Sequence, residues 1–179
     1  MKKLLSLLLV LVLALSFTAC GKQSAEAYIK QEMERFKNGE GLESVQADLG
    51  ADVVKALLDN FAYTIVSAEE SGDTATVTVQ VTNLDMYTAV TNWITQIWVL
   101  AFDQALLPAE EQMSEEELND MMYSLLYTCM TAEDIQPVTQ ELTLNLFTGE
   151  EGWQLVSASM DALTDAMMGG FFTAMAELG

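Results

Sequence analysis

The spacing of apolar residues changes from helical to strictly alternating near residue 61, and this change constrains the fold most. Between residues 74 and 82, one alanine and three valines alternate with polar side chains. Such alternation is typical of a strand with one buried and one wet face. A similar alternation over residues 61–65 and the turn sequence 71–73 predict a β-hairpin. The chain must therefore combine antiparallel β-structure with helices.

A second hairpin is predicted near the C-terminal end. Apolar residues alternate with polar ones from Val138 to Leu146, the stretch Gly149–Gly152 has turn composition, and residues 153–156 return as a strand. The repeated two-residue period indicates that both hairpins belong to one antiparallel sheet.

Helical spacing predicts five helices around these hairpins. They cover residues 25–38, 43–60, 87–107, 114–130 and 158–177. Pro108 ends the third, and Ser114 with Glu117 forms a capping-box signature for the fourth. Gly169 and Gly170 weaken the middle of the last helix.

Together these patterns predict the α+β class. We expect a curved, cone-like antiparallel sheet of two hairpins packed against helices, with a helical insertion (87–132) between the hairpins and a C-terminal helix. The length of 179 residues suits one domain, which we place at 25–179.

The N-terminus has the composition of a secretion signal. Lys2 and Lys3 precede an apolar run of fourteen residues, which is shorter than the roughly 20 residues that a membrane-spanning helix needs. The sequence Ser16–Gly21 resembles the lipobox of bacterial lipoproteins, although Phe17 stands where Leu, Val or Ile is usual. This resemblance implies a signal peptide at 1–19, lipidation of Cys20 and a short spacer to residue 24. The protein would then be anchored by acyl chains to the extracytoplasmic face of a cell membrane. An ordinary signal peptide with an incidental cysteine is the alternative.

Three features carry a family resemblance: two helices, the strand pair from Phe61 to Val79, and the late strand containing Gly152-Trp153-Gln154-Leu155-Val156. Together they resemble small bacterial lipoproteins of the nuclear-transport-factor-2-like (cystatin-like) superfamily. The resemblance implies a sheet wrapped around helices, with an apolar cavity that relatives use for catalysis or binding. The long insertion and the helix after the last strand depart from the simplest pattern of that superfamily.

Charge and composition exclude several functions. The chain has 27 acidic and 7 basic residues, for a formal net charge of -20, and no histidine. Nucleic acid is therefore not an expected partner, because its binding depends on Lys and Arg. Mechanisms that use imidazole are excluded as well.

The basic residues are confined to one end of the mature chain. Residues 20–55 contain five basic and seven acidic side chains, whereas residues 56–179 contain twenty acidic and none that are basic. Because anionic membrane surfaces attract Lys and Arg, this polarity suggests that the N-terminal helices face the membrane. A helix with ordinary mixed surface charge explains it equally well.

The favoured function is a non-catalytic binding or interaction module for an apolar small molecule or a cationic peptide. The expected pocket contains aromatic residues and one carboxylate, although core packing would explain the aromatic ones too: Trp93, Trp98, Asp103, Tyr123, Trp153 and Phe172. One alternative is an enzyme that uses Asp103 in the same cavity. Another is a structural envelope protein that assembles through its Met-rich C-terminal helix.

No cofactor or specific metal site is expected. Carboxylates cluster at Glu110–Glu111, Glu115–Glu117 and Asp120. They lack the spacing of a calcium-binding loop, and the helix dipole stabilises acidic side chains at the start of a helix without a bound ion. Cys129 has no histidine to activate it and lies among apolar residues, so we expect an inert core side chain. The sequence does not determine the oligomeric state.

Overall fold

Four antiparallel strands form one open sheet in the computed structural model, which describes residues 23–178. The strands are β1 (Ala62–Ser71), β2 (Thr74–Leu84), β3 (Pro137–Gly149) and β4 (Gly152–Leu155), and they neighbour one another in chain order. The predicted α+β class with two hairpins is confirmed, and the sheet is not closed. The predicted signal peptide 1–19, Cys20 and the first spacer residues lie outside the described residues.

The sheet has one buried and one exposed face, as the alternation predicted. Val77, Val79 and Val81 are buried almost completely on one face. The other face carries polar cross-strand pairs, such as Gln80 with Glu141 and the hydroxyls of Thr82 and Thr139. Each buried valine contributes about 1.5–3 kcal/mol through removal from water, so this face determines the register.

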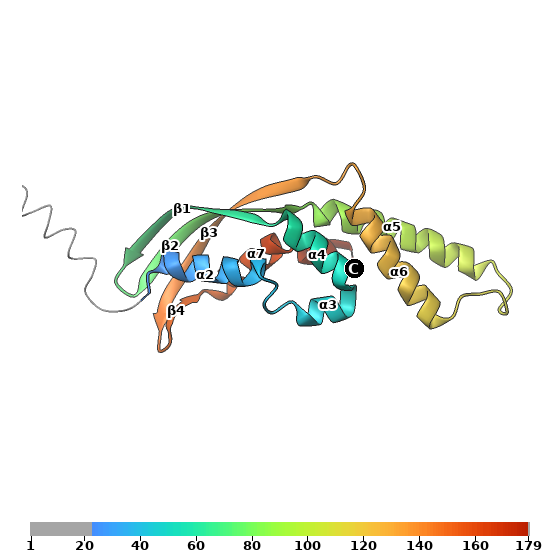
Figure 1. Cartoon of the computed structure of the whole chain (residues 1–179), viewed down its shortest axis with the longest axis horizontal. Coiled ribbons are helices and arrows are strands. Elements are labelled where there is room, and N and C mark those ends of the chain that lie inside the picture. Colours follow the sequence, from blue (N-terminus) through green and yellow to red (C-terminus); the bar gives the residue numbers. More distant parts are fainter. Residues whose placement is uncertain (1–22, 179) are drawn as a thin grey trace, which may run out of the picture.

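Helices pack against the buried face of the sheet. They are α2 (Ala25–Lys37), α4 (Ala51–Asn60) and α7 (Ser157–Met167), and Figure 1 shows the sheet arching over them. Their fully or almost fully buried side chains include Ile29, Met33, Leu57 and Leu163, which fill the space under the sheet. The concave side is thus a packed core.

A hydrogen bond between side chains also joins β1 to α2. Tyr63 Oη donates to a carboxylate oxygen of Glu34 at 2.6 Å. Burial and this bond to a carboxylate raise the pKa of Tyr63 to about 12.

The single helix predicted for 43–60 is wrong, because Gly50 interrupts it. The structure has α3 (Glu43–Leu49) and then α4, and Gly50 between them has a φ of 94°. Glycine adopts this backbone conformation without the steric cost that a Cβ atom imposes. The chain can therefore change direction at this residue.

The predicted C-terminal helix is also divided in two. It consists of α7 and α8 (Phe171–Leu178), with Gly169 and Gly170 at φ values of 65° and 86° in the turn. The carbonyl of Gly169 accepts a hydrogen bond from the backbone N–H of Met86 at 3.0 Å. This turn therefore docks on the start of α5 (Met86–Ala105), the first helix of the insertion.

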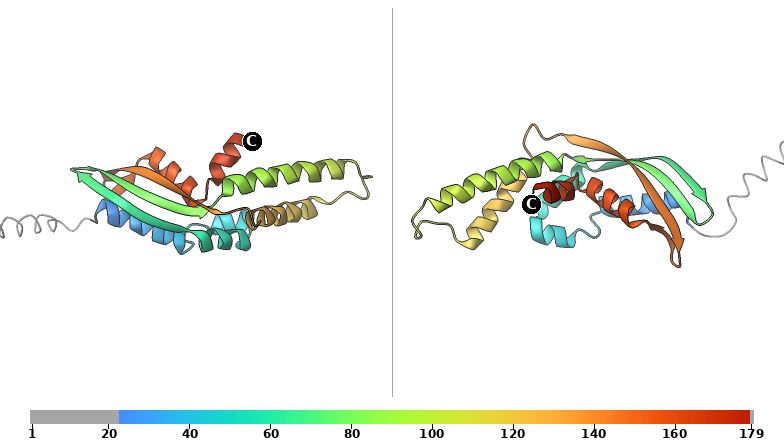
Figure 2. Two further views of the ribbon diagram at one scale, coloured as in Figure 1. Left: turned by 90° about the horizontal axis from the view of Figure 1, so that it is seen from above. Right: turned by 180° about the vertical axis from the view of Figure 1, so that it is seen from behind.

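The helical insertion leaves the sheet and returns to it at one point. It contains α5 (Met86–Ala105) and α6 (Glu115–Met130), and we call residues 86–130 the arm. Leu84 at the end of β2 pairs with Pro137 at the start of β3. The arm therefore begins and ends at the same end of the β2–β3 pair. Pro137 is the first residue of β3. Both views in Figure 2 show the arm projecting away from the sheet.

The start of α2 lies at the opposite end of the sheet from the arm. The backbone N–H of Ala25 donates to the Glu70 carboxylate at 2.6 Å, and the N–H of Thr148 donates to the carbonyl of Asp73 at 2.8 Å. These contacts bring the beginning of α2 and both hairpin turns together. The eleven residues of β2 separate this end from the root of the arm by about 36 Å.

Candidate interaction surface on the helical arm

Local signals in the sequence position both helices of the arm. The Asp85 carboxylate caps α5 by accepting from the backbone N–H of Thr88 at 3.0 Å and from its hydroxyl at 2.7 Å. The Ser114 hydroxyl accepts from the N–H of Glu117, whose carboxylate accepts in return from the N–H of Ser114 at 2.8 Å. The predicted capping box is confirmed.

Side-chain hydrogen bonds connect α5 to α6. Trp93 Nε1 donates to the carbonyl of Met122 at 2.8 Å, and Gln96 Nε2 lies 3.2 Å from Cys129 Sγ. Near the tip, Gln104 Oε1 accepts from the backbone N–H of Met113 at 2.7 Å. These contacts fix the relative position of the helices at both ends of the arm.

An open, mostly apolar groove of about 530 Å³ lies between α5 and α6. A groove of this size could hold part of an apolar ligand or a side chain of a partner. Its lining comes only from the two helices: Ile97, Leu100, Ala101, Gln104, Glu115, Leu118, Asn119 and Met122. We call it the inner groove.

The face of α5 turned away from this groove is also apolar. Trp98, Phe102 and Leu106 are spaced by four residues, so they lie in one row along the helix. Their exposed fractions are 63%, 68% and 84%. We call these three residues the outer stripe. Large apolar side chains exposed in a row are typical of a surface that binds a partner.

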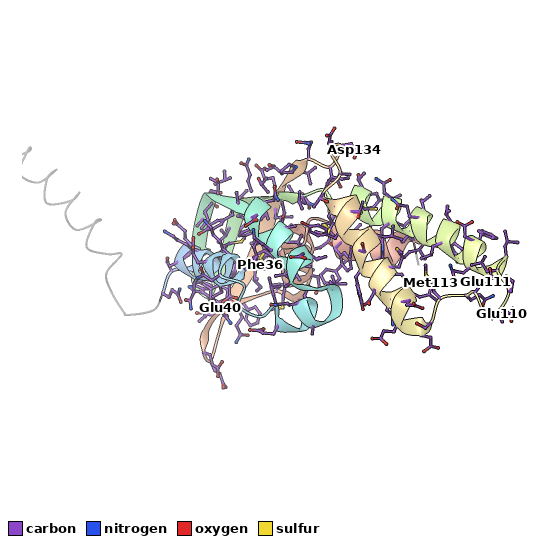
Figure 3. The ribbon with its side chains drawn as sticks, turned by 45° about the vertical axis from the view of Figure 1, so that its right-hand side comes forward. Phe36, Glu40, Glu110, Glu111, Met113 and Asp134 are labelled. Carbon is purple, nitrogen blue, oxygen red and sulfur yellow. The ribbon has the colours of Figure 1, made fainter. Side chains whose placement is uncertain are left out.

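The surroundings of the outer stripe are acidic. Asp103 follows Phe102 directly, and Glu110 and Glu111 lie at the outer end of the arm, as Figure 3 shows. The arm has seven acidic and no basic residues. All seven lie between residues 103 and 120, so the potential of the arm is most negative toward its tip.

The structure does not gather the six predicted pocket residues into one pocket. Trp98 and Asp103 are exposed on α5, Tyr123 is exposed on α6, and Trp93 is half-buried between these helices. In β4, Trp153 packs half-buried against the sheet core.

Phe172, the sixth of these residues, lines a smaller hollow of about 250 Å³. This hollow lies between the end of α2 and the α7–α8 turn, and Figure 3 labels Phe36 and Glu40 there. Arg35, which also lines it, bonds to the carboxylates of Glu32 and Glu40 at 3.2 Å and 3.1 Å. Its guanidinium is thus already paired with acids of this chain.

Cys129 and the acidic side chains are the candidate groups for reactivity and metal binding. Cys129 is buried, and burial, with a smaller effect of Asp134, raises the pKa of its thiol, which disfavours the nucleophilic thiolate. Within residues 23–178, no group of three or more His, Cys, Asp or Glu side chains is placed to hold a metal ion.

Sequence reasoning did not identify the outer stripe, although a signal was present. Residues 97–102 are apolar at six consecutive positions, which gives α5 apolar side chains all around its circumference. A helix packed on one side needs only one apolar face, so this run indicates burial on two sides or an exposed binding surface. Of the predicted pocket residues, only Trp98 belongs to the stripe.

Comparisons with known proteins assign no family. No protein-family profile matches the chain, and no curated protein sequence matches it. One solved structure is similar: a "putative lipoprotein (ycdA)" from Bacillus subtilis subsp. subtilis str. 168, with 13% sequence identity and a TM-score of 0.43. The match covers 87% of this chain and 54% of that protein, so this chain spans about half of its length. Among the described helices, none is long and apolar enough to cross a bilayer.

Proposed function

We propose that the protein is a lipid-anchored, extracytoplasmic interaction module without catalytic activity. The observation that carries this proposal is the exposure of the outer stripe on an arm at the end of the sheet opposite the start of α2. Cys20 precedes Ala25 by five residues, which reach at most about 18 Å. An acylated Cys20 would hold the hairpin-turn end of the sheet near the membrane and leave the arm accessible from outside.

The packing of the domain supports a binding role over catalysis. The side chains under the sheet are buried against helices, and Asp103, the candidate carboxylate, is exposed to solvent. An exposed carboxylate has no pocket around it to orient a substrate. We therefore assign Asp103 to the acidic surroundings of the outer stripe, and we call Asp103, Glu110 and Glu111 its acidic border.

Lipidation of Cys20 is tested by feeding cells an alkyne-tagged fatty acid and following the label and the protein in membrane fractions. We expect Cys20→Ala to lose the label and to leave the extracytoplasmic membrane pool, because acyl chains supply the anchor. Cys129→Ala, a change at the other cysteine, should keep both. A wild-type protein without label, or a labelled Cys20→Ala protein, would refute the anchor.

Two finer assignments belong to this proposal. The strand pattern that includes Gly152–Val156 supports kinship with nuclear-transport-factor-2-like lipoproteins. A structural envelope role through the C-terminal helix is the second candidate, since Phe172, Met175 and Leu178 leave one face of α8 exposed. Light scattering distinguishes it from a monomeric binder, because assembly through α8 would be lost in Phe172→Ser with Met175→Ser.

A further inference from the structure

The outer stripe is a surface that residues 23–178 leave uncovered. In its second half, α5 places Ile97, Leu100 and Ala101 toward α6, while Trp98, Phe102 and Leu106 remain in solvent. The short helix α8 packs near the start of α5, where Tyr87 Oη donates to Glu177 at 2.8 Å. Within residues 23–178, no element covers the stripe beyond that point.

The charge of the arm argues against a second copy as the occupant. Packing two outer stripes together would bring Asp103, which follows Phe102 of the stripe directly, close to the same residue of the second copy, and neither arm has a basic residue to compensate. Like charges brought together at an interface are unfavourable and select against that partner.

The same charge, together with the position of the arm, argues against a lipid surface. Anionic headgroups repel carboxylates such as Glu110 and Glu111 at the tip. The arm also lies at the other end of the sheet from the start of α2, beside which the anchor would lie. The membrane that holds the protein would therefore be remote from the stripe.

The remaining partner must combine an apolar face with positive charge. From Trp98 to Leu106 the stripe extends about 12 Å along the helix axis, which two to three turns of another helix can cover. Basic side chains beside such a helix would meet Asp103 along the stripe and Glu110 and Glu111 beyond its end. An arginine could also stack on the exposed indole of Trp98.

We propose that the outer stripe is the docking surface for a cationic amphipathic helix of an extracytoplasmic partner. Leucine-sized side chains of that helix pack on Trp98, Phe102 and Leu106, and its Lys and Arg residues pair with the acidic border. The compartment of the partner rests on the proposed function, because it follows from the lipid anchor. The docking chemistry depends on the arm alone.

Synthetic peptides test this inference on the full chain in phosphatidylcholine nanodiscs, with empty nanodiscs as the blank. One peptide of about 14 residues places Leu and Lys at helical spacing, and a second has the same composition in scrambled order. We expect the amphipathic peptide to bind more tightly than the scrambled one, and to bind more weakly as salt rises, because the ionic contacts are exposed.

Two matched double variants locate the binding surface. Phe102→Ser with Leu106→Ser removes most of the outer stripe, whereas Phe172→Ser with Met175→Ser removes a comparable exposed face on α8. We expect the first to weaken binding at least about tenfold, as truncation of apolar anchors does at interfaces, and the second to leave it unchanged. Asp103→Asn with Glu110→Gln and Glu111→Gln should reduce the salt dependence.

Several results would overturn the inference. Equal binding of both peptides would indicate attraction to the acidic body alone, and unchanged affinity in the α5 variant would exclude the stripe. A dimer seen by light scattering that the α5 variant abolishes would make a second copy the occupant. A wild-type protein that carries no lipid label would refute the anchor without changing the affinity for the peptide, so the two proposals fail separately.

Discussion

At the scale of single residues, Gly169 has the most restricted environment of the described glycines. A Cβ atom added there would lie 2.1 Å from the carbonyl oxygen of Leu84, and the φ of 65° is costly for other residues. We expect Gly169→Ala to lower the free energy of unfolding by about 3 kcal/mol, from the left-handed conformation and the weakened hydrogen bond to Met86. Urea denaturation measures this loss.

Gly72→Ala is the matched control for this prediction. Gly72 has a similar φ of 62°, but an added Cβ would meet nothing within 4 Å. Its substitution should therefore cost only the conformational part, about 1–2 kcal/mol. Equal losses in the two variants would show that the contact between the α7–α8 turn and Leu84 is not as close as described.

At the scale of elements, the capping box stabilises the start of α6. We expect Ser114→Ala to cost about 1 kcal/mol and to speed hydrogen exchange in the first turn of that helix, because the N–H of Glu117 loses its acceptor. Ser124→Ala in the middle of α6 makes the same chemical change without removing a cap, and alanine favours helices. Faster hydrogen exchange in the Ser124 variant, or exchange in the Ser114 variant that is no faster than in the wild type, would contradict the assignment.

This capping box also depends on pH. The hydrogen bonds from Ser114 to the Glu117 carboxylate hold the pKa of Glu117 below its ordinary value. A lowered pKa in the folded state stabilises the fold above the unfolded pKa, and this contribution disappears as the pH falls through the folded value. The difference between wild type and Ser114→Ala should therefore shrink in acid.

The elements could be predicted from the sequence where the decisive interactions are local. Alternation of apolar and polar residues identified the strands. Pro108 marked the region where α5 ends, and Ser114 marked the start of α6. Each of these signals acts within a few residues. The break at Gly50 was missed, and Gly169–Gly170 was expected to weaken one helix and not to divide it, since helical spacing of apolar residues continues across both sites. Which side of α5 is covered also escaped prediction, because Ile97 and Trp98 are both large and mainly apolar, and only the packing of α6 distinguishes them.

At the scale of the whole molecule, both the charge polarity and the length of the tether bear on the orientation at the membrane. Arg35 pairs with Glu32 and Glu40, and Lys55 pairs with Asp59, so these cations are compensated within the chain. Both hairpin turns, beside the start of α2, contain acidic residues. Attraction of the N-terminal helices to an anionic surface would therefore depend mainly on Lys30 and Lys37, and the length of the tether becomes the stronger constraint on orientation.

The tether predicts which end of the molecule lies near the membrane. A fluorophore on Asp73→Cys, in the first hairpin turn, should be quenched by nitroxide-labelled headgroups, because the five-residue reach from Cys20 to Ala25 keeps this end within about 18 Å of the anchor. A fluorophore on Glu110→Cys at the arm tip should escape quenching, since β2 alone places the root of the arm about 36 Å further along the sheet. The buried Cys129 should react little with the fluorophore. Labelling of the protein without either substitution measures this background. Equal quenching at both sites would mean that the molecule lies flat on the membrane, and the outer stripe would then be no more accessible than the hairpin turns.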